Sequence, residues 1–142
     1  MIYLLDTDIL SIWQNGTGTD YAVLALRMSA HPLTDIGVAV VSFHEQMIGA
    51  NAYLSRGRTT ADVVGGYERM ERLRRWFAVL DLVPYDAAAG AMFDQLKAAK
   101  IRVGTMDLRI AAVALARNLT VVTHNARDFG QVPGLTVEDW TQ

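Results

Sequence analysis

Short, largely apolar runs recur along the chain, and they constrain the fold more than any other feature of the sequence. Ile2–Leu5 and Gly37–Ser42 are the clearest of these runs, and Val79–Val83, Thr120–Thr123 and Leu135–Val137 have a similar character. A strand without a polar face must be covered on both faces, as the strands of a parallel sheet are. We therefore expect an α/β fold with a mostly parallel sheet that is covered by helices on both sides.

Helical patterns separate the apolar runs. The expected helices are Asp8–Gln14, Tyr21–Ala30, Phe43–Leu54, Thr60–Phe77, Asp86–Ala99 and Met106–Arg117. Asp8 and Asp86 stand where a side chain can cap the N-terminus of a helix. In a parallel sheet built this way the crossovers are right-handed, and sites form at the carboxyl ends of the strands, where the strand order reverses.

The composition is globular rather than disordered. Of 142 residues, 51% are hydrophobic and 20% are charged, and the length suits one domain that spans residues 1–142. The chain has no cysteine, which excludes disulfides and cysteine-based zinc sites and fits a cytoplasmic location. It has no membrane-length apolar stretch, no basic signal-peptide region, no nucleotide-binding glycine loop and no Gly-x-Ser-x-Gly motif. Membrane, nucleotide-loop and serine-nucleophile chemistries are therefore without support.

The charges are distributed unevenly, although the net charge is only −2. Through Glu45, Arg27 is the one basic residue against five acids, whereas residues 56–75 carry six arginines against three acids. A run of this kind is most often the solvated face of a helix. The alternative is that these arginines contact phosphate groups.

Asp6 and Glu45 are acids placed close behind expected strands. Asp6 follows Ile2–Leu5 directly, so it lies at the carboxyl end of that strand. Because Asp8 is better placed for helix capping, Asp6 is left without a structural role. Glu45 shares a helical stripe with Ile48, Gly49 and Ala52, where a charge is costly unless it is paired or bound to a cation.

Asp107 and Asp128 complete a set of four candidate acids. Asp107 lies in the first turn of its helix and shares an apolar stripe with Ile110 and Ala111. Capping accounts for its position along the helix but not for its place on the apolar face. Asp128 lies in an expected loop past the fourth strand, where it is either a turn residue or part of the same site. Asn125 nearby is a second candidate for that position.

Four converging carboxylates repel one another, and a divalent cation is the usual remedy. A site with oxygen ligands and no cysteine favours Mg²⁺, with Mn²⁺ as a substitute, over zinc. Such an ion activates water and polarises a phosphoryl oxygen. The acids therefore indicate metal-assisted hydrolysis of a phosphodiester.

Four segments, taken together and in order, resemble the PIN-domain ribonucleases, and in particular the VapC toxins of VapBC toxin–antitoxin modules. The segments are Leu4–Ser11, Ser42–Glu45, Gly104–Ala112 with its Asp-Leu-Arg-Ile-Ala-Ala core, and a closing segment made of Val121–Phe129 and Val132–Leu135. They span nearly the whole chain, and Gly104–Ala112 is the most specific of them.

The resemblance implies a three-layer α/β/α sandwich and a Mg²⁺-dependent endoribonuclease, the toxin of a type II toxin–antitoxin system. It also implies a homodimer and a VapB-type antitoxin partner. Asp6 and Asp107 correspond to the metal ligands and Glu45 to a further catalytic acid. Members of the family differ in whether the fourth acid stands at the position of Asn125 or of Asp128. Because Asn125 is neutral here, Asp128 inherits that role.

Two other functions compete with this interpretation. One is a non-catalytic PIN-like RNA-binding module. The other is a phosphatase of the haloacid-dehalogenase type, because Leu4–Asp8 resembles the nucleophile segment of that family. That chemistry needs a downstream lysine and a second pair of aspartates on one loop, and Lys97 and Lys100 are poorly placed for it.

Overall fold

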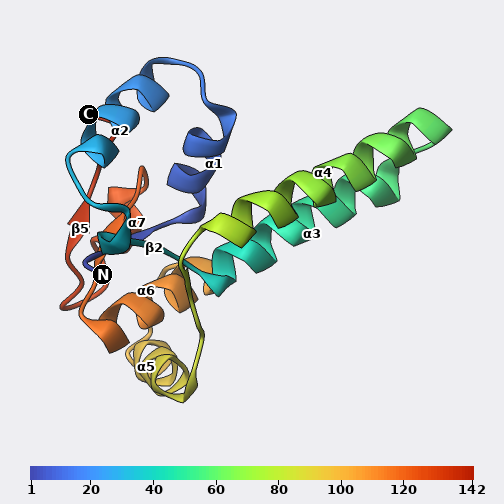
Figure 1. Cartoon of the computed structure of the whole chain (residues 1–142). Coiled ribbons are helices and arrows are strands. Elements are labelled where there is room, and N and C mark those ends of the chain that lie inside the picture. The colour runs from blue at the N-terminus through green and yellow to red at the C-terminus, as the bar shows by residue number, and fades with distance from the viewer.

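A five-stranded sheet with all neighbouring strands parallel forms the centre of the computed structural model, which describes all 142 residues (Figure 1). β1 (Tyr3–Leu5) is the middle strand and lies between β2 (Ile36–Ala39) and β4 (Thr120–Val122). β3 (Leu82–Val83) and β5 (Val137–Glu138) form the edges. The prediction of a mostly parallel sheet is confirmed.

Successive residues of β1 face opposite layers of helices, as the two-residue period of a strand requires. Leu4 packs into a core with residues of α5 (Ala87–Ala98) and α6 (Thr105–Arg117). Leu5 packs into a second core with residues of α1 (Thr7–Asn15) and α2 (Thr19–Ser29). The sheet thus separates two layers of helices, which makes the α/β/α sandwich that was expected.

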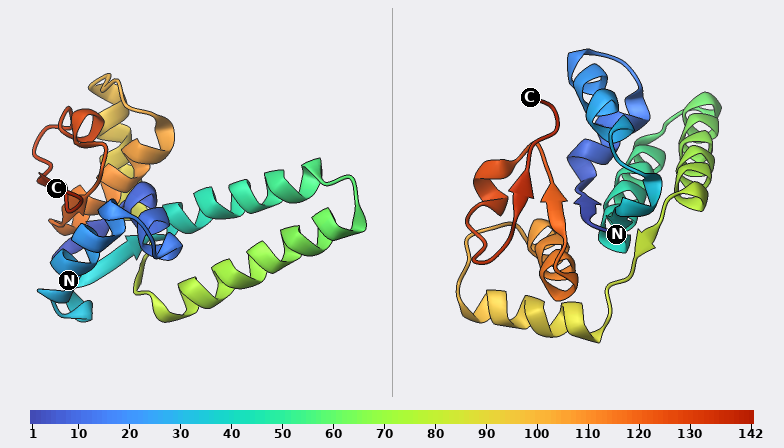
Figure 2. Two further views of the ribbon diagram at one scale, coloured as in Figure 1. Left: turned by 90° about the horizontal axis from the view of Figure 1, so that it is seen from above. Right: turned by 60° about the vertical axis from the view of Figure 1, so that its left-hand side comes forward.

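A long helical hairpin projects from this body. α3 (Val40–Arg56) runs outward and α4 (Thr60–Val79) returns, as the left view of Figure 2 shows. Thr59 and Asp62 form a capping box at the start of α4. Gly66 lets the helices approach, because a Cβ there would lie 3.2 Å from the Cα of Leu54. We call this hairpin the arm.

The strands are shorter than the sequence predicts. The run Gly37–Ser42 is a strand only as far as Ala39, because α3 begins at Val40. The run Val79–Val83 is a strand only over β3, because α4 extends to Val79. The predicted last strand, Leu135–Val137, lies two residues further along as β5. Two short helices were not predicted: η1 (Leu33–Asp35) and α7 (Ala126–Phe129).

The six predicted helices are all present, with bounds that differ by a few residues. The predicted cap at Asp86 is confirmed, because its carboxylate accepts a hydrogen bond from the Ala89 amide at 3.0 Å. Neither α4, the longest helix, nor any other is long and apolar enough to cross a membrane.

Candidate active site

The strand order reverses between β1 and β4, and polar side chains meet there. The chain runs from β1 outward through β2 to β3 and then returns to β4 on the other side of β1. Asp6 follows β1 and Thr123 follows β4. The Thr123 hydroxyl donates a 2.5 Å hydrogen bond to Oδ2 of Asp6. The site therefore forms where an open parallel sheet is expected to bind its ligand.

Asp6 is buried, with 3% of its surface exposed. Its Oδ1 accepts the Ile9 amide hydrogen at 2.9 Å and so caps α1. The prediction that Asp8 caps this helix is wrong: Asp8 is exposed and lies inside the first turn. Burial raises the pKa of Asp6 to about 7, although its hydrogen bonds from Ile9 and Thr123 act in the opposite direction.

Glu45 lies in the second turn of α3 and is half-buried. The predicted reason for its inward placement is wrong, because its neighbours Ile48 and Gly49 are exposed. A partner from another element holds it instead. The hydroxyl of Thr7 donates to Oε1 of Glu45 at 2.6 Å and also hydrogen-bonds the buried Ser42 at 2.9 Å.

Asp107 lies in the first turn of α6, on the helix face that packs into the core. Ile110 and Ala111 on the same stripe are fully buried, as the sequence predicted. The side chain of Asp107 does not cap the helix, whose N-cap residue is Gly104. Burial, together with the negative charges of Glu45, Asp8 and Asp128, raises the pKa of Asp107 to about 6.

Asp128 and Asn125, the two candidates for the fourth position, are hydrogen-bonded to each other. The Asn125 amide Nδ2 donates to Oδ2 of Asp128 at 3.0 Å, and the Asn125 backbone N–H donates to the Thr123 hydroxyl at 2.8 Å. Asp128 lies in the short helix α7 rather than in the loop that was expected. The segment after β4 thus connects Asp128 to Asp6 through Asn125 and Thr123.

The four predicted acids act on one another electrostatically, and none of them has a basic partner. Asp107 raises the pKa of Asp6, and Glu45 and Asp128 raise that of Asp107. No lysine, arginine or histidine forms a salt bridge with any of the four. We call this group of acids, together with Asp8, the acidic crevice. It is a local concentration of negative charge that a cation would relieve.

A family model for the PIN domain matches residues 3–135. This chain belongs to the PIN-domain family. That membership decides against the phosphatase of the haloacid-dehalogenase type. PIN-domain nucleases generally depend on a divalent metal ion.

Relatives of this PIN domain are VapC proteins. The tRNA(fMet)-specific endonuclease VapC of Salmonella typhimurium is 36% identical over 107 residues, which cover 72% of this chain and 74% of that protein. A crystal structure of DNA-bound VapBC from the same organism is 26% identical with a TM-score of 0.73, and covers 99% of this chain and 98% of the other. A structure of VapBC-1 from nontypeable Haemophilus influenzae covers 100% of both chains with a TM-score of 0.76 and 21% identity, and shows the same fold.

The donors of the PIN domain's acidic crevice fit a hard divalent cation. They are carboxylate oxygens, and burial together with repulsion from the neighbouring acids raises the pKa of Asp107. As the side chains stand, no three His, Cys, Asp or Glu residues are gathered closely enough to enclose a metal. Mg²⁺ is usually held by one or two carboxylates and keeps several of its waters, so it does not require such a gathering.

Sequence reasoning missed the supporting roles of Thr7, Ser42 and Asp8 in the PIN domain. Thr7 orients Glu45 through a hydrogen bond. Asp8 was considered mainly as a helix cap, but its negative charge helps to raise the pKa values of both Asp6 and Asp107. A usable signal was the polar Ser42 at the end of an otherwise apolar run, since a buried hydroxyl needs a hydrogen-bond partner.

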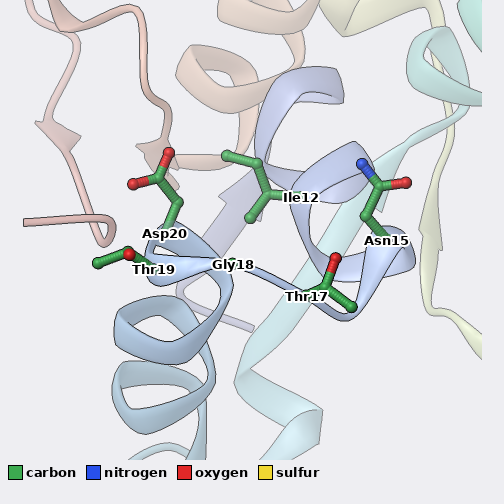
Figure 3. Close-up of a pocket in the computed structure, with 6 residues that line it drawn as sticks. All are labelled: Ile12, Asn15, Thr17, Gly18, Thr19 and Asp20. Atoms are coloured by element: carbon green, nitrogen blue, oxygen red, sulfur yellow. The ribbon is translucent and has the colours of Figure 1, made fainter.

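A second hollow of the PIN domain, of about 340 Å³, lies at the connection between α1 and α2 (Figure 3). Asp20 is its only charged residue, and none of the four predicted acids lines it. In Figure 3 the side chains of Asp20 and Asn15 lie on opposite sides of Ile12. This hollow therefore lacks the grouped acids that distinguish the crevice.

Proposed function

We propose that this PIN domain is a Mg²⁺-dependent endoribonuclease, the toxin of a type II toxin–antitoxin system, which acts in the cytoplasm as one domain over residues 1–142. One observation carries the proposal: acids from distant parts of the sequence act on one another electrostatically at the end of a parallel sheet, and none of them has a basic partner. The endonuclease and ribonuclease activities named for the VapC relatives support RNA as the substrate.

Asp6 and Asp107 are the proposed metal ligands, and Mn²⁺ should substitute for Mg²⁺. When bound, such an ion lowers the pKa of a coordinated water and polarises a phosphoryl oxygen. The protein's part is to hold the ligands ready. The hydrogen bonds from Ile9 and Thr123 fix both oxygens of Asp6, so that this carboxylate does not need to reorganise when a cation arrives.

Glu45 and Asp128 are the proposed supporting catalytic acids. Thr7 holds Glu45 in place, and Glu45 would add to the metal site or help to hold a second ion. Asn125 holds Asp128, which would orient the attacking water. Under this assignment Asn125 positions the acid rather than replaces it, which is how we interpret the fourth position.

The VapC relative from Salmonella typhimurium is named as specific for tRNA(fMet). We therefore propose tRNA(fMet) as the first substrate to test. Sequence-specific recognition of RNA usually targets single-stranded loops, so the cut is expected in an unpaired region of a folded RNA.

We also propose that the protein forms a homodimer and that a VapB-type antitoxin inhibits it. The VapBC structures that match this chain support the antitoxin partnership. Light scattering of the protein alone would test the dimer. Co-expression with the antitoxin, followed by a cleavage assay on the purified complex, would test inhibition.

The deciding experiment maps new 5′ ends across total RNA after incubation with the parent protein and with Asp107→Asn. The parent should cut discrete sites with Mg²⁺ or Mn²⁺ and none with EDTA, and the variant should cut none. If the parent cuts no RNA with either metal but still binds RNA, the alternative of a non-catalytic RNA-binding module replaces the nuclease.

A further inference from the structure

A groove of about 740 Å³ is lined by residues of α1, α3 and α4, and it reaches from the side of α1 along the arm to Arg56 at the outer end of α3. α4 contributes Arg69, Arg72 and Trp76 to its lining, α3 contributes Arg56 and Gln46, and α1 contributes Gln14. We call it the arm groove. It is separate from the acidic crevice, because none of the crevice acids lines it.

The arm groove is positively charged, and its arginines are not neutralised by acidic residues of the lining. No aspartate or glutamate lines it. Arg56, Arg69 and Arg72 are exposed and form no salt bridge. Arg74 and Arg75 on the same helix differ, because both pair with Glu71 outside the groove. Three unpaired guanidinium groups around one groove suit a partner that carries several negative charges.

The guanidinium of Arg69 is held in place by an aromatic ring. Its Cζ lies 4.2 Å from the centre of the Tyr53 ring, an arrangement that restricts the side chain without neutralising it. An oriented but unpaired guanidinium can bind a phosphate with less loss of side-chain freedom than a free one.

Uncharged groups that suit bases complete the lining. Gln14 and Gln46 form two amide hydrogen bonds with each other, of 3.0 and 2.7 Å, and present polar groups to the groove. Trp76 is half-buried and stacks on no other aromatic ring of the chain. Positive grooves with an available aromatic ring are typical of single-stranded nucleic acid binding.

The arm groove begins next to the acidic crevice. Gln46 follows Glu45 in the chain, and its amide lies 3.3 Å from the hydroxyl of Ser11. That hydroxyl in turn donates to the backbone oxygen of Thr7, whose side chain holds Glu45. A strand lying in the groove would therefore reach the crevice within a few side chains.

We propose that the arm groove binds single-stranded RNA, with Arg56, Arg69 and Arg72 on the phosphates and Trp76 stacked on a base. This inference rests on the proposed function, because it names the strand that the crevice would cut. Proteins and double-stranded RNA are the competing occupants, and the tests below separate them.

The main test compares two double variants with equal loss of charge, each in the inactive Asp107→Asn background. Arg69→Ala/Arg72→Ala removes two groove arginines, and Arg74→Ala/Arg75→Ala removes the two arginines that pair with Glu71. Binding of a labelled single-stranded RNA of about ten nucleotides is measured by fluorescence anisotropy over a range of salt. A hairpin duplex serves as competitor.

The groove variant should bind at least about tenfold more weakly than its control, and the salt slope of log K should be shallower by about 1.4, the value for two lost contacts to a single strand. The control should keep both the affinity and the slope of its background. Equal behaviour of the two variants would overturn the proposal, and so would better competition by the duplex than by unlabelled single strand.

Gly49 offers an independent test within the arm groove. Gly49 is exposed and a Cβ at this position would meet no atom within 4 Å, so a β-carbon can be added there without a clash. Gly49→Glu should weaken RNA binding about as much as loss of the groove arginines, because it adds an acid to the groove, whereas Gly49→Ala should not. RNA binding by Gly49→Glu equal to that of Gly49→Ala would contradict the proposal, and loss only of antitoxin binding would identify the groove as a protein surface.

The outcomes also separate this inference from the proposed function. If the parent cuts RNA, Asp107→Asn does not, and Arg69→Ala/Arg72→Ala cuts as well as the parent, the arm groove fails and the nuclease stands. If the parent cuts nothing but the groove variants lose RNA binding, the nuclease fails and the groove stands.

Discussion

The acidic crevice and the arm groove are neighbours that concentrate opposite charges by different means. Asp6 in the crevice is buried and both of its oxygens accept hydrogen bonds, and burial raises the pKa of Asp107 as well. Arg56, Arg69 and Arg72 in the groove are all exposed. Charges that lie in a poorly solvated site interact strongly and respond little to salt, whereas exposed charges are screened.

This difference indicates that one small protein can assign catalysis and substrate binding to two separate regions. On the proposed function, the crevice holds a cation and carries out the chemistry, and hydrogen bonds to Asp6 set part of its geometry. On the inference drawn for the arm groove, its exposed arginines hold a flexible polyanion by long-range attraction that salt can weaken. Changes in the crevice should therefore affect catalysis and stability, and changes in the groove should affect substrate binding.

The largest expected effect is loss of cleavage in Asp107→Asn. Removal of a metal ligand should lower kcat/KM by about 10³-fold or more, because a bound divalent ion contributes several kcal/mol to stabilising the transition state. Initial rates on an RNA that the parent cuts would measure it. The circular dichroism spectrum should not change, and a variant that keeps even a tenth of the parent rate would remove Asp107 from the proposed ligands.

The next effect is a fall in the stability of the metal-free protein as the pH rises. The pKa values of Asp6 and Asp107 are about 7 and about 6 in the folded chain, against an ordinary value of 3.8. Between these limits the folded state binds more protons than the unfolded state, so the free energy of unfolding decreases as the pH increases. The loss should be on the order of 2–4 kcal/mol, mostly from the buried Asp6.

Urea unfolding in EDTA from about pH 5 to about pH 8 would measure this slope. Acids with lowered pKa values, such as Asp62 and Asp86, titrate below this range and should not mask it. Asp6→Asn should flatten the slope, and Mg²⁺ should stabilise the parent more at the upper end than at the lower, because protons compete with the metal. A parent slope that Asp6→Asn leaves unchanged would show that the crevice acids do not carry it.

The dependence of KM and kcat on salt concentration should distinguish the arm groove from the acidic crevice. An increase from about 50 mM to about 200 mM should lower kcat/KM by about 20-fold if three arginines contact phosphates of a single strand. Because the exposed groove arginines would contact the strand rather than the reacting phosphate, the change should appear in KM, with kcat nearly constant. Steady-state kinetics at four salt concentrations would test it, and a fall in kcat at constant KM would place the screened charges in the crevice instead.

The smallest expected effect is a difference between two substitutions of Asp6. Asn can still accept the Ile9 amide hydrogen and cap α1, whereas Ala cannot, so Asp6→Ala should be less stable than Asp6→Asn by about 1 kcal/mol. Both variants should be inactive. Urea midpoints measured at a single pH would compare them, because neither variant has an ionisable group at this position. Equal stability would mean that the cap contributes nothing measurable.

Much of the sheet and part of the site could be predicted from local patterns. The apolar runs predicted the parallel sheet because the inner strands β1, β2 and β4 consist largely of apolar residues that are buried. Asp107 was predicted correctly to lie on a buried face, since Ile110 and Ala111 are on its own helix. Such properties depend on neighbours in the sequence, and periodicity reveals them.

The features that were missed depend on contacts between distant segments. The run Gly37–Ser42 is apolar almost throughout, but pairing with Leu82 and Val83 extends only to Ala39, after which the chain enters α3. Glu45 faces the crevice because of Thr7, 38 positions earlier, and its own helical stripe gives no sign of that partner. Likewise, the run of arginines does not reveal which of them border α1.

The close approach of the two arm helices has a consequence for where an RNA would be cut. Gly66 allows α3 and α4 to pack in close contact, so we expect the arm to behave as one rigid element. The distance between the arm groove, which would hold the strand, and the acidic crevice, which would cut it, is then set by the packing of α3 against α4. Such an enzyme would cleave the RNA at a fixed number of nucleotides from the segment that it holds. All of its products would then end at the same distance from that segment.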